Sequence, residues 1–230
     1  MNLSSAPARL ARSLVNAVVG DQLRTVRILS GVGRGRRVQL DLSVEKAYWL
    51  GHYERPLQWF LREHVGPEDV FFDVGAHIGF FSVCAGGLGA RVVAVEPDPR
   101  HAARLRTNAR LNGLDVVVVE AAAWDESGTV GLVEGGSAKE RSAVVGDDVA
   151  ATTLDDVAER HGMPTVIKLD VEGAESRALA GARRILAEAS PIVLCELHGD
   201  EQRARVLDIL AGWNVEELES PYRIAAARRP

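Results

Sequence analysis

The chain has 230 residues, of which 47% are hydrophobic and 26% are charged, and its formal net charge is −5. This composition fits one globular domain that is large enough to bury a full core. The acidic balance argues against a nucleic-acid partner, which usually requires a basic face, and no apolar run is long enough to span a membrane. Cys84 and Cys195 lack the spacing of a zinc site, which favours a reducing, cytoplasmic location.

Residues 1–50 are predicted to form an extension that precedes a domain at 51–230. The extension begins with an amphipathic helix at 8–19, which either covers the domain or lies on a membrane surface. A hairpin of two strands follows, at 25–29 and 37–42. The turn between them contains a GxGxG pattern, but no helix comes after it, so a hairpin is favoured over a phosphate-binding loop.

From residue 70 onward, short apolar strands alternate with longer helical segments. This alternation predicts βαβ units, and therefore an α/β doubly wound, mostly parallel sheet. The expected strands are 70–73, 91–96, 116–119, 165–169 and 192–196, and the expected helices are 80–88, 99–111, 153–160, 173–186 and 200–210.

Two further segments complete the predicted organisation. Residues 215–218 and 223–226 are expected to form an antiparallel hairpin at the edge of the sheet. Residues 125–150 are polar and rich in glycine, with a short hairpin near Gly131, and are expected to form a lid or a wall of the substrate site.

The end of the first strand indicates a nucleotide pocket. The strand runs into Asp73 and a loop that contains Gly75 and Gly79, and Glu96 follows about 20 residues later, the usual position of a carboxylate that binds ribose hydroxyls. Asp73 occupies the place of the first glycine in the dinucleotide motif, where it would repel a pyrophosphate and attract an ammonium group. This pattern favours S-adenosylmethionine over NAD. The predicted cofactor contacts are Asp73, Gly75, Ala76, His77, Ile78, Gly79, Glu96, Pro97, Asp98, Ala121, Ala122 and Asp170.

Several motifs together resemble the FkbM family of S-adenosylmethionine-dependent methyltransferases, over roughly residues 50–227. The motifs are Phe72 to Ser82, Val95 to Asp98, Asn108 to Asn112, Thr153 to Asp155, Ile167 to Glu175 with Gly181-Ala182, and Glu196-Leu-His198. The resemblance implies the Rossmann-like fold of class I methyltransferases, with strand order 3-2-1-4-5-7-6 and an antiparallel final strand. It also implies methylation of hydroxyl groups on sugars, polyketides or other secondary metabolites.

Polar residues after the fourth and fifth strands are the predicted catalytic group. Asp170 ends the fourth strand, beside the first strand in such a sheet, and Glu172 lies at the mouth of the same cleft. His198 follows the fifth strand and is the predicted general base, because its unperturbed pKa is near neutrality. Asp170 is expected to position the acceptor, and Asp170 or Glu196 could orient His198. Glu175 is expected to act as a helix-cap residue.

The acceptor side is predicted to include Glu196. Tyr53 and Glu54 resemble a stretch that precedes the core in the FkbM family, and the resemblance implies that they close over the cofactor or the acceptor. The expected partner is a small hydroxylated molecule, and a homodimer is left open.

Three alternatives stay open. Asp170, Glu172, Glu196 and His198 could hold Mg²⁺, although a metal-free site is favoured. The chain could be an NAD-dependent oxidoreductase on a similar fold. It could also be a module that binds S-adenosylmethionine without catalysis.

Overall fold

The computed structural model of the protein describes residues 23–134, 141–218 and 224–229. The helix predicted at 8–19 lies outside these residues, as does the turn at Ser220-Pro221 between the last two strands. Along the described ranges, no helix is both long and apolar enough to cross a membrane.

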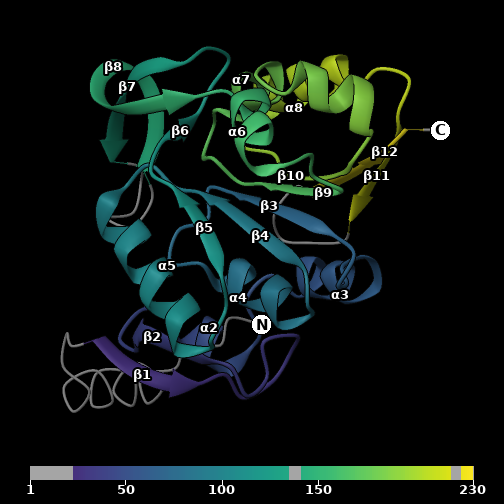
Figure 1. Ribbon diagram of the computed structural model, residues 1–230. Coiled ribbons are helices and arrows are strands. Elements are labelled where there is room, and N and C mark those ends of the chain that lie inside the picture. The colour runs from purple at the N-terminus through teal and green to yellow at the C-terminus, as the bar shows by residue number, and fades with distance from the viewer. Residues whose placement is uncertain (1–22, 135–140, 219–223, 230) are drawn as a thin grey trace, which may run out of the picture.

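A seven-stranded sheet forms the centre of the molecule (Figure 1). Its strands are β3 (Val70–Val74), β4 (Arg91–Val95), β5 (Val116–Val119), β9 (Val166–Leu169), β10 (Ile192–Glu196), β11 (Asn214–Leu218) and β12 (Ile224–Arg228). The order across the sheet is β11-β12-β10-β9-β3-β4-β5, which reads 3-2-1-4-5-7-6 from the β5 edge when β3 is counted as the first strand. The first five strands pair in parallel, and β12 is antiparallel to both β10 and β11. The predicted mixed α/β fold with a parallel-rich central sheet is confirmed.

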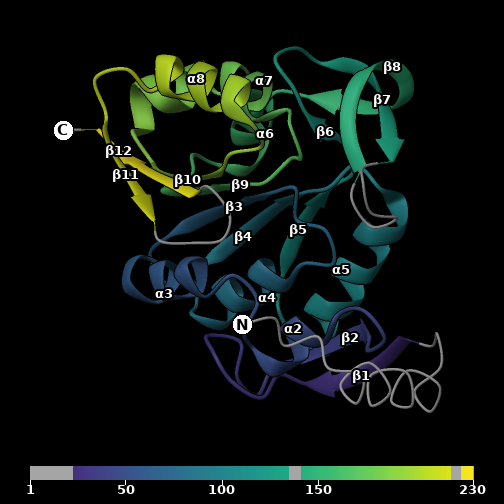
Figure 2. The same cartoon turned by 180° about the vertical axis from the view of Figure 1, so that it is seen from behind.

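Helices cover both faces of this sheet (Figure 2). Phe71 points to one face, towards α3 and α4, whereas Phe72 and Val74 point to the other face, towards α6, α7 and α8. Because side chains alternate along a strand, each strand must be apolar on both faces, as the sequence predicts. The first layer contains α2 (Lys46–Leu50), α3 (Arg55–His64), α4 (Phe80–Gly87) and α5 (Pro99–Leu111), and the second contains α6 (Leu154–His161), α7 (Glu175–Ala180) and α8 (Asp200–Ile209).

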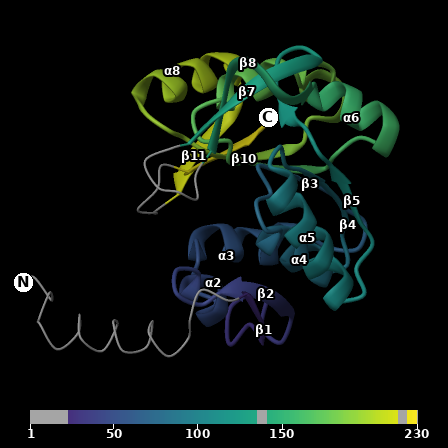
Figure 3. The same ribbon diagram turned by 90° about the vertical axis from the view of Figure 1, so that its left-hand side faces the viewer.

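The predicted N-terminal hairpin is present as β1 (Leu23–Arg27) and β2 (Arg37–Asp41), which pair antiparallel. It lies beyond α4 and α5 as seen from the sheet (Figure 3). Val38 and Leu40 are buried in the same apolar cluster as Phe81 and Cys84 of α4. The described part of the predicted extension therefore shares a core with the rest of the chain, while the boundary at residue 50 stays a prediction.

The prediction of one continuous helix at 173–186 is wrong. It divides into α7 and a π-helical turn, Ile185–Ala189. At Gly181 the backbone packs so closely that a Cβ atom would lie 2.0 Å from the carbonyl oxygen of Trp124. The Asp155 carboxylate accepts the backbone N–H groups of Arg184 and Ile185, at 2.9 and 3.0 Å. These contacts come from segments distant in the sequence, so local periodicity could not predict the break.

A second small sheet lies at the carboxyl end of β5 (Figure 1). It consists of β6 (Ala122–Ala123), β7 (Gly128–Glu134) and β8 (Arg141–Thr152), in the order β6-β8-β7. β7 and β8 form the hairpin predicted near Gly131, but with longer strands and a register shift between Val130 and Gly131. The predicted role of this region as a lid or wall stays a prediction.

Candidate functional site

The loop after β3 is held against the end of β9 by a glycine. Gly75 adopts a φ of 70°, a left-handed conformation that favours glycine. A Cβ atom there would lie 1.7 Å from the backbone oxygen of Asp170. This contact places Asp170 directly beside the predicted nucleotide loop. The loop ends at Gly79, which precedes α4.

Glu96, at the end of β4, is anchored by the backbone of two neighbouring loops. One carboxylate oxygen accepts the N–H of His77 at 2.7 Å, and the other accepts the N–H of Asp98 at 2.9 Å. His101 lies beside it, with Nδ1 3.7 Å from Oε1. Each carboxylate oxygen can accept a further hydrogen bond, so this fixed group is suited to a diol.

The Asp98 side chain is engaged at the start of α5, and its predicted contact with the cofactor stays a prediction. It caps α5 by accepting the N–H of Arg100 at 2.8 Å, and it also pairs with the Arg100 guanidinium at 2.9 Å. Burial acts to raise the pKa of Asp98, but these hydrogen bonds lower it to about 2. The carboxylate is thus engaged in the helix cap, and Asp98 presents its backbone N–H to Glu96.

Asp73 lies beneath the loop, fully buried, and next to a cation of the chain itself. Asp73 and Lys168 are register partners on the adjacent strands β3 and β9, and the Lys168 Nζ is 3.5 Å from Oδ1 of Asp73. The same Nζ donates to the carbonyl oxygen of Gly75 at 2.9 Å and lies 3.4 Å from Asp170. Ser82 of α4 donates to the other oxygen of Asp73 at 2.6 Å. The sequence led us to expect a cofactor ammonium beside Asp73, whereas the structure places Lys168 there.

Burial acts to lower the pKa of Lys168, but the charges of Asp170, Asp73 and Glu54 together raise it. Lys168 therefore stays charged and links the loop after β3 to the end of β9.

His198 lies among three carboxylates at the ends of β9 and β10. Its Nδ1 is 2.7 Å from Oε1 of Glu175, a fully buried residue at the start of α7. Its Nε2 is 3.2 Å from Glu172 and 3.6 Å from Glu196. The structure therefore brings together the four residues that the sequence placed at this rim: Asp170, Glu172, Glu196 and His198.

The charge of this cluster changes the expected chemistry of His198. Burial acts to lower its pKa, but the hydrogen bond to Glu175 and the charges of Glu175, Glu172 and Asp170 raise it to about 9. Burial and the charges of Asp170 and Glu54 raise the pKa of Glu196 to about 8. These shifts favour a proton on the His198 imidazole, and the role of His198 as general base stays a prediction.

Comparison with known proteins identifies the family of the chain. The family model described as "Methyltransferase FkbM domain" matches residues 73–218, which is more than half of the chain. The chain belongs to the FkbM methyltransferase family. No curated protein matches the sequence.

Solved structures share the fold of this FkbM chain. A methyltransferase FkbM from Methylobacillus flagellatus KT is 22% identical, with a TM-score of 0.53, and the match covers 71% of this chain and 44% of that one. A precorrin-6y methyltransferase from Geobacter metallireducens GS-15 is 13% identical, with a TM-score of 0.53 and coverage of 77% and 90%. A T. Thermophilus 16S rRNA methyltransferase, solved with AdoMet and guanosine, is 14% identical, with a TM-score of 0.56 and coverage of 91% and 50%. This chain spans less than half the length of the Methylobacillus FkbM protein.

The remaining predicted cofactor contacts of the FkbM chain differ in how deeply their side chains are buried. Ile78 and Ala76 are buried in apolar clusters, so any ligand contact there falls to the backbone. His77 has a φ of 50° and packs edge-on against His101, with ring centroids 4.0 Å apart. Pro97, Ala121 and Ala122 follow β4 and β5, and Ala122 belongs to β6.

The predicted acceptor-side residues before α3 lie close to the cluster. Tyr53 packs on two aromatic rings. Its ring centroid lies 4.2 Å from that of Tyr48 and 6.0 Å from that of Phe81. Glu54 is buried at the start of α3, and its Oε2 has no hydrogen-bond partner among the described residues. Burial and the charge of Asp170 raise the pKa of Glu54 to about 7.

Lys168 was not predicted as a site residue, and Glu175 was predicted only to cap a helix. A lysine inside an apolar strand is rarely buried without a partner, so Lys168 carried a usable signal. Glu175 does accept the N–H of Gly173 at 2.8 Å, but its contact with His198 joins segments 23 residues apart and needs the tertiary structure.

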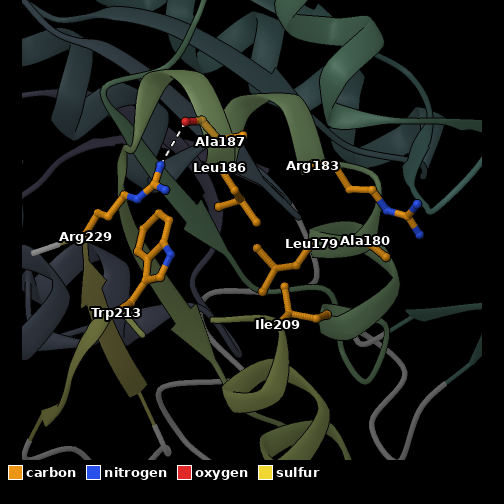
Figure 4. A pocket seen from close by; sticks show the side chains of 8 residues that line it. All are labelled: Leu179, Ala180, Arg183, Leu186, Ala187, Ile209, Trp213 and Arg229. Carbon is orange, nitrogen blue, oxygen red and sulfur yellow. Dashed lines mark hydrogen bonds between the residues drawn. The ribbon is translucent and has the colours of Figure 1, made fainter. Parts of the chain in front are cut away.

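A groove lies elsewhere on the surface, in the helix layer that contains α7 and α8 (Figure 4). It contains none of the residues predicted for the site. Its lining is Leu179, Ala180, Arg183, Leu186, Ala187, Ile209, Trp213 and Arg229.

Proposed function

We propose that this chain transfers a methyl group from S-adenosylmethionine to a hydroxyl group of a small molecule or sugar, in secondary-metabolite or glycan biosynthesis. One observation carries the proposal. A backbone-anchored carboxylate, Glu96, lies beyond β4, and a cluster of acceptor carboxylates lies beyond β9 and β10 along the same edge of the sheet. In sheets of this kind, ligands bind outside the carboxyl ends of the strands.

The cofactor half of the site fits an adenosyl group through the chemistry of its donors and acceptors. Glu96 would accept hydrogen bonds from the ribose diol, and the loop from Gly75 to Gly79 would approach the ligand closely with its backbone. When bound, S-adenosylmethionine would supply the methyl group from its sulfonium, with the thioether of S-adenosylhomocysteine as the leaving group. Asp73 is assigned to holding Lys168 and the loop, because it is fully buried beside that lysine.

The acceptor half would bind and orient a hydroxyl group. Asp170, Glu172 and Glu196 are hydrogen-bond acceptors, and a hydroxyl group is a donor that suits them. Holding the acceptor oxygen in line with the transferred group can contribute about 7–11 kcal/mol. Asp170, Glu172 and His198 stay the proposed catalytic residues, with Asp170 positioning the acceptor and the cluster around His198 taking up the proton that the hydroxyl group loses. Tyr53 and Glu54 are proposed to border the acceptor.

Calorimetry tests the cofactor assignment. Wild-type protein should bind S-adenosylmethionine and not NAD. Glu96→Ala should weaken S-adenosylmethionine binding by roughly 1.5–3 kcal/mol, the value of hydrogen bonds to a charged group. Glu159→Ala removes an exposed carboxylate of α6 and serves as the matched control, with unchanged affinity. Equal affinities of wild type and Glu96→Ala would remove Glu96 from the site.

Turnover tests the reaction. We expect formation of S-adenosylhomocysteine when the protein is supplied with S-adenosylmethionine and a panel of hydroxylated sugars and polyketides. Asp170→Asn keeps the shape of the side chain and removes its charge, so it should lower turnover more than it lowers cofactor affinity. Binding of S-adenosylmethionine without turnover on any hydroxylated compound would favour the non-catalytic alternative.

A further inference from the structure

The ends of β9 and β10 hold three side chains with the spacing of metal ligands. One oxygen of Asp170, one oxygen of Glu196 and one ring nitrogen of His198 all lie within 4.8 Å of one another. Donors that share one ion at about 2.0–2.2 Å can be no more than about 4.4 Å apart. Small rotamer adjustments would therefore bring the three atoms onto one ion.

The orientation of His198 matches that of a metal ligand. Histidines that bind metals almost always donate their second ring N–H to a carboxylate or a carbonyl group. Here Nδ1 lies 2.7 Å from the fully buried Glu175, which leaves Nε2 facing Glu196 at 3.6 Å and Glu172 at 3.2 Å. Glu175 is itself held by the N–H of Gly173. This supporting hydrogen bond is independent of the ligand spacing.

A buried carboxylate oxygen without a hydrogen bond adds a second observation. Glu54 is 6% exposed, and its Oε2 makes no hydrogen bond within the described part of the chain. Glu54 lies near the cluster, since Asp170 and Lys168 are the charged groups that act on it most strongly. Leaving such an oxygen unsatisfied is costly, and a nearby cation would offset that cost.

The local charges are unbalanced. Six acidic side chains lie around Lys168, whose ammonium group is already engaged by Asp73, Asp170 and the carbonyl oxygen of Gly75. A divalent ion would compensate the excess negative charge. The acidic side chains are Glu54, Asp73, Asp170, Glu172, Glu175 and Glu196.

We propose that Asp170, Glu196 and His198 bind one divalent first-row transition-metal ion, with Mn²⁺ as the representative. One imidazole among carboxylates suits such an ion better than Mg²⁺, which prefers oxygen ligands and water. The site goes beyond the proposed methyl transfer, because ion binding needs neither cofactor nor acceptor.

Mn²⁺ titration tests the site. Full-length protein is freed of metal with EDTA, dialysed, and titrated with Mn²⁺ in the absence of S-adenosylmethionine, while free Mn²⁺ is followed by electron paramagnetic resonance. We expect one saturable site per chain. His198→Gln and Glu196→Gln should each weaken binding at least tenfold, and Glu175→Gln, which acts through His198, by about 10–100-fold.

Matched controls and competition complete the experiment. Glu159→Gln and His161→Gln change the same residue types on α6 and should bind Mn²⁺ like the wild type. Circular dichroism and chemical denaturation establish that each variant is folded; His198 is partly exposed, so His198→Gln should fold. Mg²⁺ should compete at least tenfold less well than Mn²⁺.

Two results would overturn the proposal: no saturable binding by the wild type, or wild-type affinity in both His198→Gln and Glu196→Gln. Equal competition by Mg²⁺ would overturn the choice of ion. Calorimetry with S-adenosylmethionine in EDTA tests the cofactor assignment separately, so either idea can fail without the other.

Discussion

The candidate site has two halves, one around Glu96 and the other around His198, and the hydrogen-bonding needs of their carboxylates are met in opposite ways. Around Glu96, carboxylates meet donors that the backbone provides: His77 and Asp98 donate to Glu96, and Arg100 donates to Asp98. Around His198, carboxylates outnumber donors, and Glu54 and Glu175 each keep a buried oxygen that accepts no hydrogen bond from the part of the chain that the structure describes. Both halves lie at the carboxyl ends of strands in one sheet.

This difference indicates two kinds of ligand. A carboxylate fixed by backbone N–H groups keeps its charge and geometry before a ligand arrives, which suits binding of a neutral diol. A cluster of carboxylates with too few donors takes up protons or a cation instead, as the raised pKa values of Glu54 and Glu196 indicate. Lys168 and Gly75 join the two halves, so changes there should have the largest effects.

Replacing Lys168 by methionine should destabilise the protein most. The substitution leaves the buried carboxylates of Asp73 and Asp170 without their cation, at a cost of about 3–5 kcal/mol. Urea denaturation measures the change in free energy of unfolding. Lys46→Met, on the short helix α2, is the control and should cost less than about 1 kcal/mol. A loss below about 1 kcal/mol for Lys168→Met would show that the two halves are not linked by this charge.

Gly75→Ala should have the next largest effect. Alanine pays roughly 1–2 kcal/mol for a left-handed conformation, and its Cβ would also collide with the backbone of Asp170. Gly35→Ala is the matched control, with a φ of 82° and no atom within 4 Å of the added Cβ. We expect Gly75→Ala to cost at least about 2 kcal/mol more than the control in urea denaturation. Equal costs would mean that the loop can move away from β9.

The two halves should respond to pH in opposite directions. Glu54, Glu196 and His198 have pKa values raised in the folded state, to about 7, 8 and 9. The stability they contribute is present at low pH and is lost as pH rises through these values. The pKa of Asp98 is lowered to about 2, so its contribution is present above its unfolded pKa and is lost as pH falls towards 2.

For protein in EDTA, the free energy of unfolding should therefore be greatest near pH 5 and should decrease towards pH 9. The decrease should be at least about 1.4 kcal/mol, the value of one pKa unit. Urea denaturation from pH 4 to pH 9 measures it, and Glu196→Gln should flatten the alkaline side. A curve that rises from pH 5 to pH 9 would contradict the assigned charges.

Loss of a helix cap should have the smallest effect. Asp98→Ala removes the acceptor of the Arg100 N–H, and Thr153→Ala removes the acceptor of the Asp156 N–H on α6. Each should cost about 1 kcal/mol. Asp98→Asn should recover part of this loss, because asparagine caps equally well, but it still lacks the charge that pairs with Arg100. If Asp98→Asn is as destabilising as Asp98→Ala, the charge of Asp98 contributes more than its capping hydrogen bond.

The sequence by itself determined the alternation of elements and the half of the site that rests on local motifs. Apolar runs bounded by glycine and proline placed α5 and β10 at their observed limits, because hydrophobic periodicity is a local property. The positions of Gly75 and Glu96 followed from the strand–loop–helix pattern, and the family motifs gave the methyltransferase assignment.

Only the tertiary structure decided the partners of the charged groups. Whether Asp73 meets a ligand or Lys168 depends on the register of β3 against β9. The raised pKa of His198 depends on Glu175, which approaches it from another helix. Such effects follow from burial and from charges brought together by folding, and these properties belong to the packed chain and not to any local stretch of residues.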